Sequence, residues 1–336
     1  MSRPVYFVGT IGLDTAEEVF EGVGACLGDH VRQIPDGEVA GRRQWVTYQL
    51  PVLRSYGFLR PVPPNRFVPL ELNPGVRQSE IRFAELGYAR EARTSYSDFI
   101  AARKRGLVGP RVRMQVGMPT PFAVLKAFLT PDAFAAVEEA YTMAMLDELA
   151  EIARRIPHED LAFQWDVAPE MIEWDAHGNA GGLLGKDGRE GVLTRMKRLS
   201  ETVPADVPHG YHFCYGDFNA SQVEKPSTPT AMIDLYNSLS ERIDRPINWV
   251  HMPIPAHADQ AFFECFRALR LRPETQLYLG LVYGVGNRHA AEERIALATQ
   301  VLPSFGLATR CGIARGRTSQ EVRELLDLHA ALAAAN

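Results

Sequence analysis

The chain has 336 residues, of which 46% are hydrophobic and 23% are charged, close to the average of globular proteins. This composition excludes a disordered chain, a collagen-like fibre and a coiled coil. The formal net charge of −5 gives no sign of a nucleic-acid partner, and no apolar run reaches the roughly 18 residues that a membrane span needs. Four scattered cysteines and the lack of a recognisable signal peptide favour a cytoplasmic protein with reduced thiols.

Eight short apolar runs predict strands that are buried on both faces, as in a parallel sheet. They cover residues 5–9, 31–35, 111–117, 161–167, 210–214, 247–252, 276–282 and 306–311. Helical stretches lie between them and have start signals at Thr15, Pro131 and Thr318. Alternating strands and helices predict an α/β fold, a single (β/α)8 TIM barrel domain over residues 1–336. A doubly wound sheet is the main alternative.

Two segments interrupt this alternation. Residues 56–74 are rich in proline and predict no regular element, whereas a long helix is expected from Ser79 to about Arg105. We interpret residues 56–108 as an insertion after the second strand that covers one end of the barrel. A glycine-rich segment, residues 178–191, follows the fourth strand and is expected to be a mobile loop.

Metal-capable side chains occur where the predicted strands end, which is where barrel enzymes place their chemistry. His212 and Cys214 end the fifth strand, and alternate residues of a strand point to the same side. His251 ends the sixth strand and Cys311 ends the eighth. Two thiolates and one or two imidazoles would suit a tetrahedral zinc ion. Ordinary buried cysteines are the alternative, and the spacing alone leaves both open.

Carboxylates mark two further strand ends. Asp36 and Glu38 follow the second strand, and Asp166 ends the fourth. Taken alone, Glu38 is more typical of a surface carboxylate paired with Arg42 or Arg43. Trp45 and Tyr48 are expected to shape the mouth of a pocket at this end of the barrel.

Four segments together resemble the catalytic barrel of the cobalamin-independent methionine synthase family. They are His212-Phe-Cys-Tyr-Gly-Asp-Phe-Asn219, Arg310-Cys-Gly-Ile-Ala-Arg315, Asp36-Gly-Glu38 with the following Arg42, Arg43 and Tyr48, and Gln164-Trp-Asp166 with Pro169. The first two resemble the zinc-binding His-x-Cys and Cys-Gly motifs. The resemblance implies zinc that binds a thiol substrate as its thiolate, which then attacks a methyl donor. It also implies that Glu38 and Asp166 bind the amino group of homocysteine.

The chain also departs from the family pattern. His251 stands where the family has a glutamate ligand, so we expect it to be the fourth ligand or, if unbound, to leave an open coordination position. Val167 replaces a carboxylate, and Leu13 replaces a small hydroxyl residue. The position of the family's general-acid histidine is not matched, and His289, four residues further on, is the candidate for proton transfer.

The leading hypothesis is a zinc-dependent enzyme that transfers a methyl or larger alkyl group onto or off a thiol. In it, His212, Cys214, His251 and Cys311 bind the metal, whereas Asp36, Glu38 and Asp166 contact the substrate. Its partners would be a small-molecule thiol and a methyl or alkyl donor, without nucleic acid or membrane, and a homo-oligomer is left open.

Three alternatives are kept. The first is a zinc Lewis-acid transferase or lyase that acts on a thiol without an amino group, as in the epoxyalkane:coenzyme M transferases. The second is a metal-free barrel similar to uroporphyrinogen decarboxylases, for which Asp36, Arg42 and Arg43 would be suited. The third is a non-catalytic binding protein.

Overall fold

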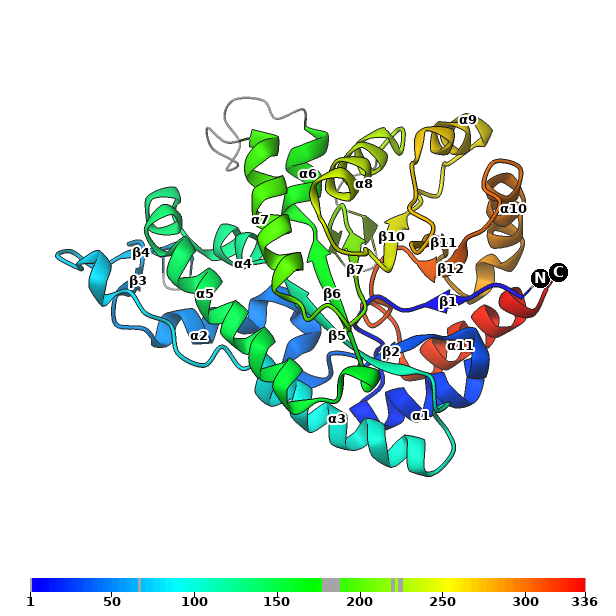
Figure 1. The fold of residues 1–336 in the computed structure, drawn as a ribbon, viewed down its shortest axis with the longest axis horizontal. Helices are drawn as coiled ribbons and strands as arrows, with labels where there is room; N and C mark the ends of the chain where they lie inside the picture. The colour runs from blue at the N-terminus through cyan, green and yellow to red at the C-terminus, as the bar shows by residue number, and fades with distance from the viewer. Residues whose placement is uncertain (1, 66–67, 177–187, 219–220, 223–225, 336) are drawn as a thin grey trace.

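A computed structural model describes residues 2–65, 68–176, 188–218, 221–222 and 226–335. Eight parallel strands form one sheet in the order β1-β12-β11-β10-β7-β6-β5-β2. An isolated parallel bridge between Val5 and Val31 joins the two edges of this sheet, so the strands close into a barrel. Helices pack around the outside (Figure 1). The predicted (β/α)8 TIM barrel is therefore confirmed, and the doubly wound alternative is excluded.

All eight predicted strands are present. They are β1 (Val5–Tyr6), β2 (Gln33–Pro35), β5 (Arg113–Pro119), β6 (Leu161–Val167), β7 (His209–Phe213), β10 (Trp249–Pro253), β11 (Gln276–Val282) and β12 (Gly306–Thr309). The first two are shorter than predicted. They flank the place where the barrel closes through the single bridge, and few ladder hydrogen bonds define a strand there.

The helices form the outer ring. They are α1 (Ala16–Leu27), α2 (Gln49–Ser55), α3 (Tyr88–Lys104), α4 (Pro121–Phe128), α5 (Pro131–Arg155), α6 (Pro169–Asp175), α7 (Gly188–Thr202), α8 (Thr230–Arg242), α9 (Gln260–Glu264), α10 (Arg288–Thr299) and α11 (Ser319–Ala334). The side chains of Thr15, Thr130 and Thr318 accept backbone N–H groups at the starts of α1, α5 and α11. No described helix has the length and apolar character that a membrane crossing requires.

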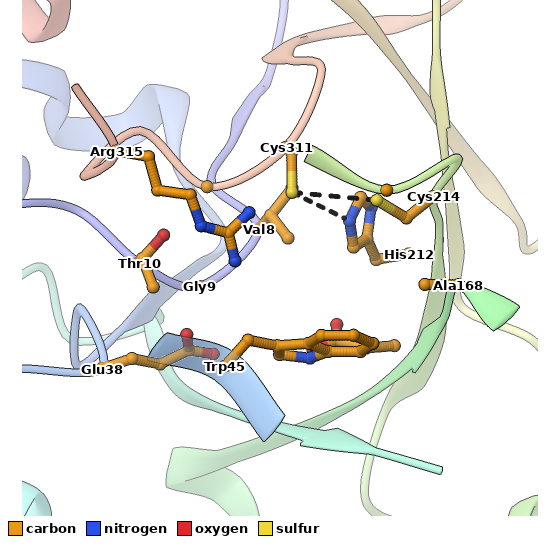
Figure 2. Close-up of a pocket in the computed structure, with 13 residues that line it drawn as sticks. Val8, Gly9, Thr10, Glu38, Trp45, Ala168, His212, Cys214, Cys311 and Arg315 are labelled. Atoms are coloured by element: carbon orange, nitrogen blue, oxygen red, sulfur yellow. Dashed lines mark hydrogen bonds between the residues drawn. The ribbon is translucent and has the colours of Figure 1, made fainter. Parts of the chain in front are cut away.

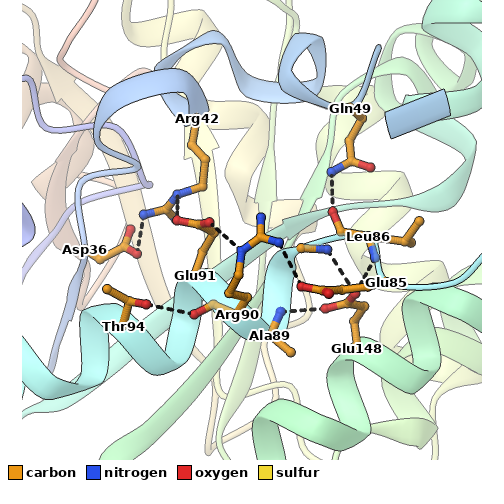
Figure 3. Close-up of polar contacts among 11 residues, drawn as sticks. Asp36, Arg42, Gln49, Glu85, Leu86, Ala89, Arg90, Glu91, Thr94 and Glu148 are labelled. Carbon is orange, nitrogen blue, oxygen red and sulfur yellow. Dashed lines mark hydrogen bonds and ion pairs between the residues drawn. The ribbon is translucent and has the colours of Figure 1, made fainter. Parts of the chain in front are cut away.

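The segment between β2 and β5 differs from its prediction at two points. β3 (Leu59–Pro61) and β4 (Leu70–Leu72) pair antiparallel inside the proline-rich stretch that was expected to have no regular element. The helix α3 begins at Tyr88 and not at Ser79. The carboxylate of Glu148 on α5 accepts the N–H groups of Leu86, Gly87 and Ala89, which fixes the start of α3 there (Figure 3).

Residues 177–187, which include most of the glycine-rich segment expected to be a mobile loop, lie outside the described residues. Its last part is helical, because α7 starts at Gly188. A short antiparallel pair, β8 (Asp217–Phe218) and β9 (Ser221–Gln222), follows β7. Asn219, at the end of the segment that resembles the zinc motif, also lies outside the described residues.

Aromatic residues close the amino end of the barrel. The rings of Trp249 and Tyr278 lie beside Gly210 and Gly306 of the adjacent strands, where an added Cβ would come within 2.4 Å and 2.3 Å of them. Glycines on one strand thus make room for aromatic rings on the next. The cavity described below lies at the other end, at the carboxyl ends of the strands, as is usual for barrel enzymes.

Candidate metal centre

A cavity of about 190 Å³ lies at the carboxyl ends of the barrel strands (Figure 2). Its lining residues are Val8, Gly9, Thr10, Glu38, Trp45, Asp166, Ala168, His212, Cys214, Gly216, Cys311, Gly312 and Arg315. Five of the eight predicted site residues are among them. Within the described part of the chain, the other three do not line this cavity: Asp36, His251 and His289.

The side chains of His212, Cys214 and Cys311 converge, with their ligand atoms all within 4.8 Å of one another. The Sγ atom of Cys311 lies 3.9 Å from Sγ of Cys214 and 3.6 Å from Nε2 of His212. Zinc bonds of about 2.3 Å to sulfur and about 2.0–2.1 Å to nitrogen predict tetrahedral edges of about 3.8 Å and about 3.6 Å. Two of the three edges therefore already fit a zinc ion.

The two thiols share a hydrogen bond that shifts their pKa values in opposite directions. Cys214 Sγ donates to Cys311 Sγ, and this contact holds the pKa of the Cys311 thiol well below its ordinary value. His212 lowers this pKa further, whereas burial opposes both effects. The same contact and burial raise the pKa of Cys214. One proton thus belongs to the pair, and a cation bound between the two sulfurs would replace it.

His251, the predicted fourth ligand, lies behind His212 as its register partner on the neighbouring strand. Its Nδ1 atom is 2.7 Å from Nδ1 of His212, and its Nε2 atom is 2.8 Å from the carbonyl oxygen of Thr309. Both ring nitrogens are thus engaged away from the cavity. This corrects the prediction that His251 is a ligand, because no lone pair of its ring faces the thiols. Burial, and to a lesser degree His212, lower the pKa of His251 well below its ordinary value.

Asp166 is held at the cavity wall by two donors. Its carboxylate accepts from Nε2 of Gln164 at 2.7 Å and from the indole Nε1 of Trp45 at 3.0 Å. Gln164 also donates to the carbonyl of Val8, so it connects β6 to β1 across the barrel interior. Burial outweighs these hydrogen bonds and the nearby His212 and raises the pKa of Asp166 to about 6.

The loop after β2 carries Glu38 and Trp45 to the cavity in a strained conformation. Three of its residues other than glycine have positive φ angles, at 46° for Glu38, 56° for Ala40 and 47° for Trp45. Such conformations are costly for side chains with a Cβ atom and concentrate at functional sites. Burial, together with the charges of Asp166 and Asp36, raises the pKa of Glu38 well above its ordinary value.

Asp36 supports this loop and does not face the cavity. Its carboxylate accepts from Nη2 of Arg42 at 2.8 Å, from the hydroxyl of Ser95 at 2.6 Å and from the N–H of Glu38 at 2.9 Å (Figure 3). Although burial opposes it, Arg42 holds the pKa of Asp36 below its ordinary value. The oxygens of Asp36 thus hold the loop, and its side chain lines an adjoining pocket with Arg42 and Glu38, so its contact with the substrate stays a prediction.

His289, the predicted proton-transfer residue, lies on α10 with 86% of its side chain exposed, and it pairs with Glu293 one helical turn away. The structure therefore does not bring it to the cavity. Sequence reasoning also gave no role to Arg315, whose guanidinium reaches into the cavity beside Cys311 (Figure 2). Its place at the end of the segment that resembles the Cys-Gly motif was the available signal.

No protein-family model and no curated protein sequence matches the chain. Solved structures do match its fold. A candidate vitamin-B12 independent methionine synthase from Listeria monocytogenes superimposes with a TM-score of 0.60 at 14% identity, covering 99% of this chain and 98% of its own. A methyltransferase from Methanosarcina mazei gives a TM-score of 0.49 at 15% identity, covering 98% and 94% of the two chains. The resemblance found in the sequence is thus confirmed at the level of the fold.

Proposed function

We propose that this protein is a zinc-dependent transferase that moves a methyl or larger alkyl group onto or off the sulfur of a small thiol. The observation that carries the proposal is the convergence of His212, Cys214 and Cys311 at one point of the cavity. Soft thiolates and an imidazole are the donors that zinc prefers. The fold shared with a candidate methionine synthase and the four resembling segments support the same chemistry.

Zinc at this point would bind a thiol substrate in its deprotonated form, which makes sulfur a nucleophile at neutral pH. His212, Cys214 and Cys311 would hold the zinc ion, and the thiol substrate would complete its ligands. The indole ring of Trp45 lies across the cavity from the two thiols (Figure 2). It would limit the space around the reacting sulfur and help to exclude water.

The charged groups of the cavity favour a thiol that carries an amino group. Burial raises the pKa of both Asp166 and Glu38, that of Asp166 to about 6, and a bound ammonium group would stabilise their charged forms. Arg315 supplies a positive charge on the side of Cys311, where it can contact an anionic group of the substrate. Holding the substrate at both ends would orient its sulfur and reduce the entropic part of the barrier.

A zinc Lewis-acid transferase that acts on a thiol without an amino group is the second candidate. It is supported by the apolar part of the cavity wall, which includes Val8, Ala168 and the Trp45 ring. The metal-free alternative loses its support, because Arg42 pairs with Asp36 and Arg43 bonds to the Leu13 carbonyl. These arginines support the loop and do not reach into the cavity.

Metal content tests the proposal. Protein purified without chelator should contain about one zinc ion per chain by elemental analysis. Cys311→Ser should lose most of it, whereas Cys26→Ser, which changes a half-buried thiol that bonds to Asp327 on α11, should keep it. Less than a tenth of an equivalent of zinc in the unmodified protein would refute the proposal.

Substrate preference separates the two candidates. Thiols of equal length with and without an amino group can be compared by saturation binding to the zinc-loaded protein. Tighter binding of homocysteine than of the thiol without an amino group favours the first candidate, and equal binding favours the second.

A further inference from the structure

Two buried histidines form a hydrogen-bonded chain that leads from the candidate metal centre into the barrel wall. His212 on β7 and His251 on β10 are register partners, and their Nδ1 atoms lie 2.7 Å apart. The chain continues from Nε2 of His251 to the carbonyl oxygen of Thr309 on β12, at 2.8 Å. His251 is fully buried, so its two ring nitrogens bond to Nδ1 of His212 and the Thr309 carbonyl and not to solvent.

The geometry fixes where each proton lies. A peptide carbonyl only accepts, so Nε2 of His251 carries a proton, and the Nδ1 atom of the neutral ring has a lone pair. Two lone pairs cannot face each other at 2.7 Å, so the proton between the rings lies on Nδ1 of His212. With its Nδ1 proton donated to His251, His212 can offer a lone pair to a metal only from Nε2, the atom that lies 3.6 Å from Sγ of Cys311.

The opposite arrangement is disfavoured by burial. If His251 carried protons on both nitrogens, it would be an imidazolium with no exposed surface, packed 5.7 Å from the ring of Tyr6. His212 would then carry its proton on Nε2, where an N–H group would face the thiols. A protonated nitrogen cannot bind a metal.

We propose that His251 is a positioning residue that accepts the Nδ1 proton of His212 and so fixes the tautomer whose Nε2 lone pair faces the metal. The inference rests on the zinc centre of the proposed function, because orientation of His212 matters only if it is a ligand. Partners of this kind set the tautomer and ring orientation of metal-binding histidines. It follows that the protein supplies three ligands and keeps the fourth position free for sulfur.

The proton positions can be measured without any metal. In zinc-free protein labelled with ¹⁵N, long-range nitrogen–proton correlation spectra distinguish the two neutral tautomers of each ring. We expect protons on Nδ1 of His212 and on Nε2 of His251. A proton on Nδ1 of His251 would overturn the inference, even if the protein binds zinc.

Zinc affinity tests the consequence, measured by competition with a chromophoric chelator. His251→Leu removes the acceptor and should weaken zinc binding about 10–100-fold. His251→Asn places an amide oxygen near the former Nδ1 position and should recover most of this loss. His209→Leu is the matched control, since it removes a fully buried histidine of β7 whose ring packs against Tyr211, and it should bind zinc as the wild type does.

The outcomes separate the inference from the proposed function. Wild-type protein that binds no zinc refutes the function, and the labelled protein still decides the tautomers. Tight zinc binding that His251→Leu leaves unchanged supports the function and overturns the inference. Should His251→Leu fail to fold, the nitrogen–proton spectra of the wild type decide.

Discussion

Gly312, directly after Cys311, offers a sensitive test of the metal centre. A Cβ atom at this position would lie 1.9 Å from the hydroxyl oxygen of Thr10, whereas ordinary contacts begin at 3.4 Å. With Thr10 in its present rotamer, Gly312→Ala must therefore move the segment of residue 312 away from the segment of Thr10 by about 1.5 Å, the difference between these distances. Because Thr is branched at Cβ, two of its three rotamers place Oγ1 or Cγ2 toward residue 312, and in the third Cβ itself is still only 3.1 Å away. The Cys-Gly pair is thus explained by the close approach of β1.

Overpacking of this kind costs about 1–3 kcal/mol. If the loop relaxes in the metal-free protein and must return to bind zinc, this strain lowers zinc affinity about 5–150-fold. Thr10→Ala in the Gly312→Ala background leaves the 3.1 Å contact with Cβ and a 3.2 Å contact with the backbone nitrogen of residue 10, which a shift of about 0.3 Å relieves. The double variant should therefore recover most of the affinity.

The assay is chelator competition for zinc, with a thermal melt of each variant to confirm folding. Gly286→Ala is the control, because a Cβ atom there meets nothing within 4 Å. Wild-type affinity in folded Gly312→Ala, or no recovery in the double variant, would show that the contact with Thr10 does not position Cys311.

Three further predictions concern the carboxyl groups of Glu170 and Asp166. Burial raises the pKa of Glu170 from 4.5 to about 7. The protonated carboxyl therefore stabilises the fold below pH 4.5, and about 3 kcal/mol of this stability is lost as the pH rises through 7. Glu170→Gln should abolish the loss, as measured by thermal melts at pH 5 and pH 8. Trp45→Phe removes a donor to the ionised form of Asp166 and should raise the pKa of Asp166 above about 6, as followed by ¹³C NMR titration of the metal-free protein. Asp166→Asn should weaken the binding of homocysteine about 10–100-fold and leave thiols without an amino group unaffected, in saturation binding to the zinc-loaded protein. The first prediction is contradicted if Glu170→Gln keeps the pH dependence of stability, and the second if Trp45→Phe leaves the titration of Asp166 unchanged. The third is contradicted if Asp166→Asn weakens the binding of both thiols equally.

The barrel could be predicted because its signal is local. Each strand is a short apolar run, and each run is followed by an amphipathic stretch with its own start signal. The start of α3 could not be predicted in this way. It depends on Glu148, which lies about 60 residues further along the chain and takes up the N–H groups of Leu86 and Ala89.

The candidate site was predictable to the level of strand ends, but not to the level of side-chain partners. His212, Cys214 and Cys311 follow from the periodicity of strands and the Cys-Gly resemblance. His251 also ends a predicted strand, but its ring does not face the cavity. Its Nε2 atom bonds to Thr309, which lies 58 residues further along the chain on another strand. Asp36 likewise lies at a strand end, yet its oxygens are taken by Arg42 and by Ser95 of α3.

The closure of the barrel has a mechanical consequence. The strands β1 and β2 are paired by the single bridge from Val5 to Val31, whereas the other neighbouring strands are joined by ladders of two or more residue pairs. Amide protons along this seam should exchange with solvent faster than those of β6 or β10, because fewer bonds must break to expose them. Thr10 and Glu38 follow the two strands of the seam. Widening the mouth for a bulky alkyl donor on this side would therefore break the backbone hydrogen bond from Ile11 to Gly37 and no ladder of several residue pairs.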